Sequence, residues 1–157
     1  MEVKKVLILR GLQGSGKSTF AKQWINEDPN HRVRFNRDDV RNMLGKYWVP
    51  EREEVINQMY IAFLDQAMVE GYDIVIDNMN LNQSYIDEIK KVVEEFNGWL
   101  KNYGVIKYEV EVKDFFHIPL QTCIDRDAQR EHPIGEAVIR RTYNKYKDKI
   151  PAWKYLR

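Results

Sequence analysis

Cysteine is scarce in this sequence and long hydrophobic runs are missing, and each absence excludes a class of protein. Cys123 is the only cysteine among the 157 residues, which excludes an intramolecular disulfide and a cysteine zinc site. It lies in a predicted helix, where we expect a small buried hydrophobic residue. The apolar runs are shorter than the ~20 residues that a transmembrane helix needs. Because the sequence begins almost directly with a predicted strand, we expect no signal peptide. The short apolar runs predict no membrane contact, and the single cysteine indicates a reducing, cytoplasmic location.

Acidic and basic residues are nearly balanced overall but unevenly distributed. The net charge is +1, with 31% charged and 43% hydrophobic residues, which is typical of a globular chain and indicates one domain over residues 1–157. Residues 140–157 carry seven Lys or Arg and one Asp, whereas the preceding residues carry 18 basic and 23 acidic side chains. This basic segment could bind a polyanion, or form a helix with a solvated face. The aromatic residues among its charges are Tyr143, Tyr146, Trp153 and Tyr155.

A glycine-rich segment follows the apolar run at residues 6–9. Residues 11–19 read GLQGSGKST, which fits the pattern G-x-x-x-x-G-K-[ST] between a strand and a helix. Glycines allow backbone N–H groups to approach an anion, and the helix N-terminus adds a positive dipole. We expect Lys17 to reach the β- and γ-phosphates of ATP or another NTP, and the Ser18 hydroxyl to ligate Mg²⁺. The predicted nucleotide-binding residues are Gly14, Ser15, Gly16, Lys17, Ser18 and Thr19.

Predicted strands and helices alternate along the chain. Apolar or alternating segments predict strands at 6–9, 33–35, 74–77 and 108–116, the last of them near a sheet edge. Caps and helical periodicity predict helices at 17–27, 37–44, 50–71, 119–129 and 136–147. A further helix is expected to begin at Asn82 or Ser84 and to end before a loop or frayed turn at 98–104. The alternation indicates an α/β fold, an open parallel sheet of about four to five strands with helices on both faces.

One long helix offers a specific expectation about burial. In the helix at 50–71, an apolar face with a spacing of four is expected to be buried. Its members are Val55, Met59, Phe63 and Ala67, with Ile56 and Tyr60 widening the face.

Polar segments follow three of the predicted strands. They are the glycine-rich phosphate-binding loop at residues 11–19, which we call the P-loop, Asn36-Arg37-Asp38-Asp39 and Asp77-Asn78-Met79-Asn80. In open parallel sheets, ligands bind beyond the carboxyl ends of the strands. We therefore expect these distant segments to converge in one active site.

The second polar segment carries groups that suit transfer of a phosphoryl group to an alcohol. Such transfer uses a base in addition to charge neutralisation. Asp38 is the favoured base, and Asp39 is expected to be a helix-start residue after a possible Asn36 cap. Arg41 is expected to face the same cleft and bind an acceptor phosphate, a solvated surface arginine being the alternative. Trp48, with the neighbouring Tyr47, could stack on a nucleobase or anchor its loop.

Asp77 ends a buried strand, where an unpartnered carboxylate is costly to desolvate. Its expected partner is Mg²⁺ through water, the Ser18 hydroxyl or an acceptor group, and a purely structural hydrogen bond is the alternative. Arg126 and Arg130 are spaced i, i+4 on a predicted helix and share one face. They suit a lid at about 119–135 that neutralises phosphate charge, although a solvated face paired with Asp125 and Asp127 is equally compatible. Residues 136–157 would follow as a basic C-terminal helix and tail.

Taken together, these residues resemble the 5′-hydroxyl polynucleotide kinase family over nearly the whole chain. The resemblance rests on Gly14-Ser15-Gly16-Lys17-Ser18-Thr19, Asn36-Arg37-Asp38-Asp39-x-Arg41, Asp77-Asn78-x-Asn80 and the pair Arg126 and Arg130. It implies an α/β P-loop kinase fold and ATP-dependent phosphorylation of the 5′-OH end of DNA or RNA. Because the 157 residues leave no room for a phosphatase domain, we expect none in this chain. It also implies roles for the matching positions. Asp38 would be the general base, Arg41 would bind the 3′-phosphate, and Asp77 and Asn80 would shape the acceptor and metal site. Lys17, Ser18 and a lid arginine, Arg130 on spacing before Arg126, would contact the donor phosphates.

Two other functions are compatible with the same residues. A P-loop kinase could phosphorylate a small metabolite, such as a nucleoside, sugar or drug. A nucleotide-binding module could hydrolyse ATP slowly within a complex. The sequence leaves the oligomeric state and the choice between DNA and RNA open.

Overall fold

The computed structural model describes residues 1–155, except for the side chain of Tyr155. Leu156, Arg157 and that side chain belong to the expected basic tail and lie outside the described residues. The strands are β1 (Glu2–Arg10), β2 (Arg32–Phe35), β3 (Asp73–Ile76) and β4 (Ile106–Asp114). The first helices are α1 (Lys17–Glu27), α2 (Arg37–Met43), the 3-10 turn η1 (Pro50–Arg52) and α3 (Glu53–Val69). The later helices are α4 (Gln83–Leu100), α5 (Leu120–Ala128), α6 (Glu136–Tyr146) and α7 (Pro151–Tyr155).

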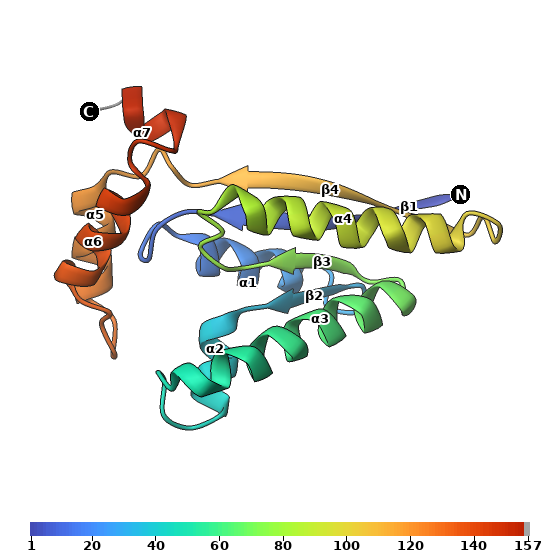
Figure 1. The fold of residues 1–157 in the computed structure, drawn as a ribbon, viewed down its shortest axis with the longest axis horizontal. Helices are drawn as coiled ribbons and strands as arrows, with labels where there is room; N and C mark the ends of the chain where they lie inside the picture. The colour runs from blue at the N-terminus through green and yellow to red at the C-terminus, as the bar shows by residue number, and fades with distance from the viewer. Residues whose placement is uncertain (156–157) are drawn as a thin grey trace.

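The strands of the described residues form a four-stranded parallel sheet in the order β2-β3-β1-β4. Val6 on the central strand β1 pairs with Ile74 of β3 on one side and with Val110 of β4 on the other. The predicted α/β architecture with a parallel sheet is therefore confirmed, as is the edge position of β4. All four strands run in the same direction, so their carboxyl ends lie along one edge of the sheet (Figure 1).

Alternating side chains of the sheet pack against helices on opposite faces. On one face, Val6 and Ile8 join a buried cluster with side chains of α3 and α4. On the other face, Leu7 and Leu9 pack against Ala21 of α1. The continuous apolar run of β1 follows from this arrangement, because both faces of that strand are covered.

Local sequence signals explain where several helices begin and end. The Asn36 side chain caps α2 by accepting a hydrogen bond from the Asp39 backbone N–H at 2.8 Å. Asn82 caps α4 in the same way through Ser84 N–H at 3.0 Å, which resolves the two expected cap positions in favour of Asn82. Gly71, with a φ of +79°, terminates the α3 region in a conformation that favours glycine.

Two local expectations were confirmed only in part. Of the face expected on α3, Ile56 and Ala67 are buried and Met59, Tyr60 and Phe63 are half-buried, but Val55 is exposed, and Leu64 and Met68 are buried as well. The buried face is therefore turned away from Val55, because α3 packs against both the sheet and α2. In addition, α4 continues through Gly98 to Leu100, where a loop or frayed end was expected.

Helices α5, α6 and α7 form a separate layer at the carboxyl ends of the strands (Figure 1). Cys123 and Ile139 are fully buried between them, and Trp153 packs against Phe116 with ring centroids 5.2 Å apart. Cys123 is thus the buried small hydrophobic residue that was expected. This packing holds the layer beside the P-loop.

Within residues 1–155, none of the helices is both long and apolar enough to span a membrane.

Candidate functional site

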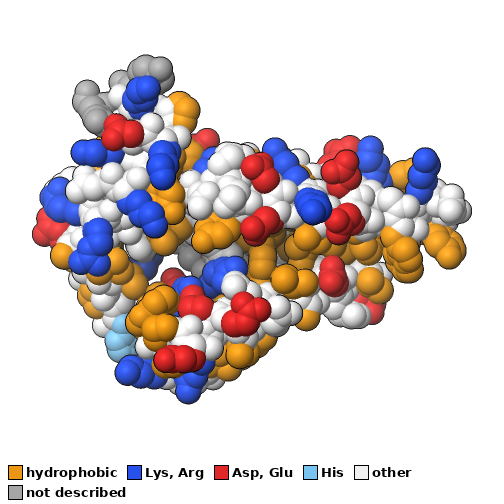
Figure 2. All heavy atoms as spheres, viewed as in Figure 1, with side chains coloured by type: hydrophobic (Ala, Val, Ile, Leu, Met, Phe, Trp, Pro, Cys, Tyr) orange, Lys and Arg blue, Asp and Glu red, His pale blue; other side chains and the backbone are white. Residues whose placement is uncertain are grey.

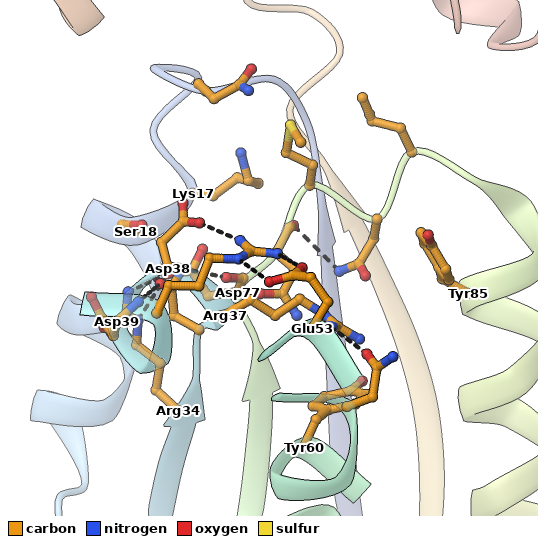
Figure 3. A pocket seen from close by; sticks show the side chains of 18 of the residues that line it. Lys17, Ser18, Arg34, Arg37, Asp38, Asp39, Glu53, Tyr60, Asp77 and Tyr85 are labelled. Carbon is orange, nitrogen blue, oxygen red and sulfur yellow. Dashed lines mark hydrogen bonds and ion pairs between the residues drawn. The ribbon is translucent and has the colours of Figure 1, made fainter. Parts of the chain in front are cut away.

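A cavity of about 1840 Å³ lies where the strands end. It is lined by the P-loop, by α2, by the loop after β3 and by residues 130–134 after α5. Figure 3 shows Lys17, Ser18, Asp38 and Asp77 gathered in this region from three different segments of the chain. The structure therefore brings the three predicted polar segments to one place, at the edge where parallel sheets bind ligands.

The P-loop is shaped by glycines whose backbone conformations disfavour other residues. Gly14 and Gly16 have φ angles of +77° and +102°, and Gly16 is the N-cap residue of α1. A Cβ on Gly14 would lie only 2.3 Å from the carbonyl oxygen of Cys123 on α5. Close packing of α5 and the left-handed backbone therefore both demand glycine at position 14.

Lys17 is nearly buried, with 8% of its surface exposed. Its Nζ donates to the carbonyl oxygens of Gly11 and Leu12 at 2.8 and 2.7 Å. Burial lowers the pKa of Lys17 to about 8, partly opposed by the negative charge of Asp77. The ammonium group is thus held inside the P-loop, beside the N-terminus of α1, where an anionic phosphate would receive both charge and hydrogen bonds.

Asp77 is 1% exposed and is paired with a residue that sequence reasoning missed. Nε and Nη2 of Arg34 lie 2.8 and 2.7 Å from Asp77 Oδ2. Arg34 also forms an ion pair with Asp39. Asp39 therefore lies in the first turn of α2 and also belongs to this network. Burial lowers the pKa of Arg34, but the two carboxylates outweigh burial and raise it overall. The only sequence signal for Arg34 was a charged residue inside a short apolar strand.

The second oxygen of Asp77 bears on the expected Mg²⁺ site. Asp77 Oδ1 is buried, and no described residue forms a hydrogen bond with it. Ser18 lines the same cavity. Mg²⁺ in nucleotide sites is usually held by one or two protein oxygens together with phosphates and water. Ser18 and Asp77 fit such an ion, although residues 1–155 contain no group of three His, Cys, Asp or Glu side chains arranged to bind a metal.

Asp38 lies at the cavity rim and is fixed by two donors. Arg41 Nη1 and the Tyr47 hydroxyl donate to Asp38 Oδ1 at 2.6 and 2.7 Å. Arg41 is also bound by Glu53, through Nε at 3.0 Å and Nη2 at 2.6 Å. These hydrogen bonds to Glu53 and Asp38 raise the pKa of Arg41 despite partial burial. The Arg41 side chain is 16% exposed, so it is a bound residue of the site and not a freely solvated one.

Glu53 and Tyr47 were given no polar role from sequence. Burial, followed by the neighbouring carboxylate of Asp38, raises the pKa of Tyr47 to about 12. Hydrogen bonds from Arg41 lower the pKa of Glu53. Glu53 lies twelve residues after Arg41 at the start of α3, and this separation has no local periodicity that could have revealed the pair.

Asn80 lines the cavity, whereas Trp48 does not belong to its described lining. The Asn80 side chain is buried and donates to Leu9 O at 2.7 Å, and its φ of 48° lies in the left-handed region. This hydrogen bond from Asn80 connects the loop after β3 to β1. Trp48 is 54% exposed, and its ring centroid lies 5.9 Å from the Arg41 guanidinium. It is placed beside the Asp38–Arg41 pair, on the outer side of the rim.

The two arginines of the expected lid lie close to different parts of the P-loop. Arg126 Nη1 lies 3.7 Å from the position that a Cβ on Gly16 would occupy. Arg130 lines the cavity and contributes to lowering the pKa of Lys17. Arg130 pairs with Asp127 at 3.7 Å, as the alternative of a solvated face expected, but Asp127 itself is buried. Asp127 also accepts hydrogen bonds from the backbone N–H groups of Ile134 and Gly135 at 3.1 and 2.9 Å. It thereby fixes the turn between α5 and α6.

A glycine-rich phosphate loop at the end of the first strand of a parallel sheet defines a P-loop NTP-binding domain. The family model described as AAA domain matches residues 6–152, and the chain belongs to this family. A protein of Autographa californica nuclear polyhedrosis virus, whose name describes a bifunctional polynucleotide kinase/RNA ligase, is 28% identical over 160 residues. That match covers 91% of this chain and 21% of the viral protein.

Solved structures extend the comparison. A chain of a Pnkp1/Rnl/Hen1 RNA repair complex has a TM-score of 0.72 and 25% identity over 96% of this chain and 47% of its own length. A chain of another Pnkp1/Rnl/Hen1 complex has a TM-score of 0.66 and 28% identity over 80% of this chain and 40% of its own. A gluconokinase from Sinorhizobium meliloti 1021, at 12% identity and a TM-score of 0.52 over 96% of this chain and 79% of its own, shares the fold. The resemblance stated from the sequence is thus confirmed. This chain spans less than half the length of the viral protein and of the two Pnkp1/Rnl/Hen1 chains.

Proposed function

We propose that this chain is an ATP-dependent polynucleotide 5′-hydroxyl kinase. The observation that carries the proposal is the fixed Asp38 carboxylate at the rim of the cavity that Lys17, Ser18 and Asp77 also line. A base and a phosphate-binding loop facing one cavity are the two elements that phosphoryl transfer to an alcohol requires.

The chemistry assigned to Asp38 is proton acceptance. Asp38 Oδ1 accepts hydrogen bonds from Arg41 and Tyr47, whereas no described residue donates a hydrogen bond to Oδ2. In the proposed reaction the acceptor hydroxyl oxygen bonds to the γ-phosphorus and the bond from that phosphorus to the β,γ-bridging oxygen breaks. ADP leaves, and the hydroxyl proton passes to Asp38 Oδ2. The two donors on Oδ1 fix the orientation of the carboxylate for this transfer.

Arg41 makes a phosphate-bearing acceptor the best match for this rim. A guanidinium has five N–H donors, and three of those of Arg41 are used on Asp38 and Glu53. The two remaining N–H groups can bind a phosphate next to the base. A 5′-OH nucleotide with a 3′-phosphate presents its hydroxyl and its first phosphate together, as a simple sugar does not.

The donor side of the site would be assembled from the P-loop and the expected lid. The P-loop N–H groups and Lys17 would hold the β- and γ-phosphates of ATP. Arg130, just after the end of α5, or Arg126, on α5, would approach the γ-phosphate. Ser18 and Asp77 would hold Mg²⁺, which neutralises phosphate charge when bound. Residues 119–135 would act as the lid, and residues 136–157 would follow as the basic helix and tail.

The names of the relatives support the nucleic-acid acceptor. The viral relative is named for polynucleotide kinase and RNA ligase activity, and two structural relatives come from complexes that contain Pnkp1. Because this chain covers only part of each relative, we infer neither ligase activity nor membership of a complex from the resemblance. The proposal extends to the 5′-OH kinase step alone.

The decisive experiment compares acceptors and a base variant. Wild-type protein, radiolabelled ATP and Mg²⁺ are incubated with a 5′-OH oligonucleotide, a mononucleoside or no acceptor. We expect label on the oligonucleotide, loss of at least ~10²-fold in kcat for Asp38→Asn, and unchanged binding of an ATP analogue. Asp65→Asn, an exposed aspartate on α3, is the matched control.

Three outcomes would overturn the proposal. Preferential labelling of the mononucleoside would indicate a small-metabolite kinase. Equal ATP turnover with and without an acceptor would indicate a hydrolysing module. Full transfer by Asp38→Asn would remove Asp38 from the role of base.

A further inference from the structure

The cavity continues beyond the reaction centre, and its walls differ in charge. Where α3 and α4 line it, the described lining includes Glu54, Glu88 and Glu95 against one lysine, Lys91. The opposite boundary is formed by residues after α5 and by Tyr146 of α6. A polyanionic acceptor longer than one nucleotide would be repelled along the first wall, so the second wall is the favourable exit.

Helix α6 and the turn after it carry a basic row next to that second wall. Arg141, Lys145 and Lys149 are spaced by four residues and are exposed; we call them the α6 stripe. Arg140 is not part of it, because its guanidinium pairs with Glu136 at 2.9 Å. Figure 2 shows Lys and Arg side chains gathered on the end of the molecule formed by α5, α6 and α7, beside a hollow in the same face.

Tyr146 connects the α6 stripe to the cavity. Its ring lines the cavity, and Nζ of Lys145 and of Lys149 lie 5.4 and 5.8 Å from its centroid. An aromatic ring flanked by cations offers a base a stacking surface and its phosphates a counter-charge. Tyr143 and Trp153 pack together with centroids 5.1 Å apart in the apolar layer, and Tyr146 packs partly against the same layer. Of these three aromatic residues, Tyr146 is the one that also lines the cavity.

We propose that the acceptor strand leaves the cavity along α6, with a base against Tyr146 and phosphates beyond the first nucleotide on the α6 stripe. This inference rests on the proposed 5′-OH kinase function and adds the path of the polynucleotide. Along such a path, the protein would prefer a polynucleotide strand to a single nucleotide as its phosphate acceptor. The path also makes that preference depend on salt, because each neutralised phosphate releases counterions.

The test uses the triple variant Arg141→Gln/Lys145→Gln/Lys149→Gln. Its kcat/KM is measured for a 5′-OH 12-mer and for a nucleoside 3′-phosphate at 50–200 mM KCl. For the 12-mer we expect at least a ~10-fold loss at low salt, and a log–log salt slope that flattens by about 2 when three single-strand contacts are lost. Activity on the nucleoside 3′-phosphate should be unchanged. The matched control, Lys90→Gln/Lys101→Gln, removes two exposed lysines, one on α4 and one at its C-cap, that do not belong to the described lining of the cavity.

The outcomes separate this inference from the kinase proposal. If the wild type phosphorylates the 12-mer and the triple variant keeps its rate and salt slope, the exit path is wrong and the kinase assignment stands. If both acceptors lose activity equally, the α6 stripe acts on folding or on ATP, and the exit path is again wrong. If the wild type phosphorylates neither acceptor, the kinase proposal fails. In that case, fluorescence anisotropy of a labelled 12-mer tests whether the α6 stripe binds nucleic acid. Equal binding by the wild type and the triple variant would overturn the exit path.

Discussion

Arg34 and Asp77 are joined by two short contacts, from Nε and Nη2 of the guanidinium to Oδ2 of the carboxylate at 2.8 and 2.7 Å. The pair links the end of β2 to the end of β3, and through Asp39 it reaches the first turn of α2. It therefore orients Asp77, with its free Oδ1, and holds the helix that carries Asp38. One arginine thus connects the proposed metal side of the site to the proposed base.

Replacing this arginine should be costly for stability. Arg34→Leu leaves the Asp77 carboxylate buried without its cation, and we expect the free energy of unfolding to fall by about 3 kcal/mol. Urea denaturation at pH 7 measures the change. Arg32→Leu, on the same strand, removes an ion pair with exposed Glu27, a hydrogen bond to Trp24 O and a contact with the Trp24 ring. It leaves no buried carboxylate without a partner and should cost less than Arg34→Leu. Equal losses for the two variants, or an undiminished Arg34→Leu loss in an Asp77→Asn background, would contradict the account.

Tyr47 is expected to act as a positioning residue for the base. Tyr47→Phe removes only the hydroxyl that donates to Asp38 Oδ1 at 2.7 Å. A hydrogen bond to a charged group is worth about 1.5–3 kcal/mol, and Arg41 still holds the same oxygen. We therefore expect kcat for a 5′-OH oligonucleotide to fall by roughly tenfold, with the KM for ATP unchanged. Steady-state kinetics with Tyr103→Phe, an exposed tyrosine outside the cavity lining, provide the comparison. A change confined to the KM for ATP would refute the role.

Lys17 should make the stability of the nucleotide-free protein rise with pH. Its pKa is lowered from 10.5 to about 8 by burial, so between these values the unfolded chain binds the proton that the folded chain has released. Stability therefore increases with pH across this window, by roughly 1–2 kcal/mol from pH 8 to 9.5. Denaturation of the wild type and of Lys17→Met at several pH values measures the difference. Lys22→Met, an exposed lysine on the same helix, should retain the wild-type rise, and a rise retained by Lys17→Met would disprove the assignment.

Gly14 should resist even the smallest substitution. In Gly14→Ala the new Cβ would lie 2.3 Å from the Cys123 carbonyl oxygen, on a backbone with φ +77°. We expect a loss of about 1–3 kcal/mol in the free energy of unfolding and weaker binding of an ATP analogue. Gly98→Ala is the control, because it lies within α4 with no atom within 4 Å of the added Cβ. It should stabilise the protein by about 0.5–1 kcal/mol, and a neutral Gly14→Ala in the same thermal scans would count against close packing of α5 on the P-loop.

Local patterns predicted the elements well and their contacts less well. The apolar run of β1 predicted a strand covered on both faces, and Asn36 predicted the start of α2. On α3, however, Val55 satisfies the helical spacing and is nevertheless exposed. Spacing defines which residues share a face, but the neighbouring helix and sheet decide how far that face is rotated.

The sequence by itself determined the phosphate loop, the parallel α/β architecture and the three polar segments at the strand ends. These features depend on contiguous residues, in which backbone conformation, periodicity and caps are encoded locally. Only the tertiary structure placed Arg34 on Asp77, Glu53 on Arg41 and Tyr146 at the cavity. Side chains from distant segments meet there because burial of charge demands a partner, and only the folded chain shows which partner is within reach.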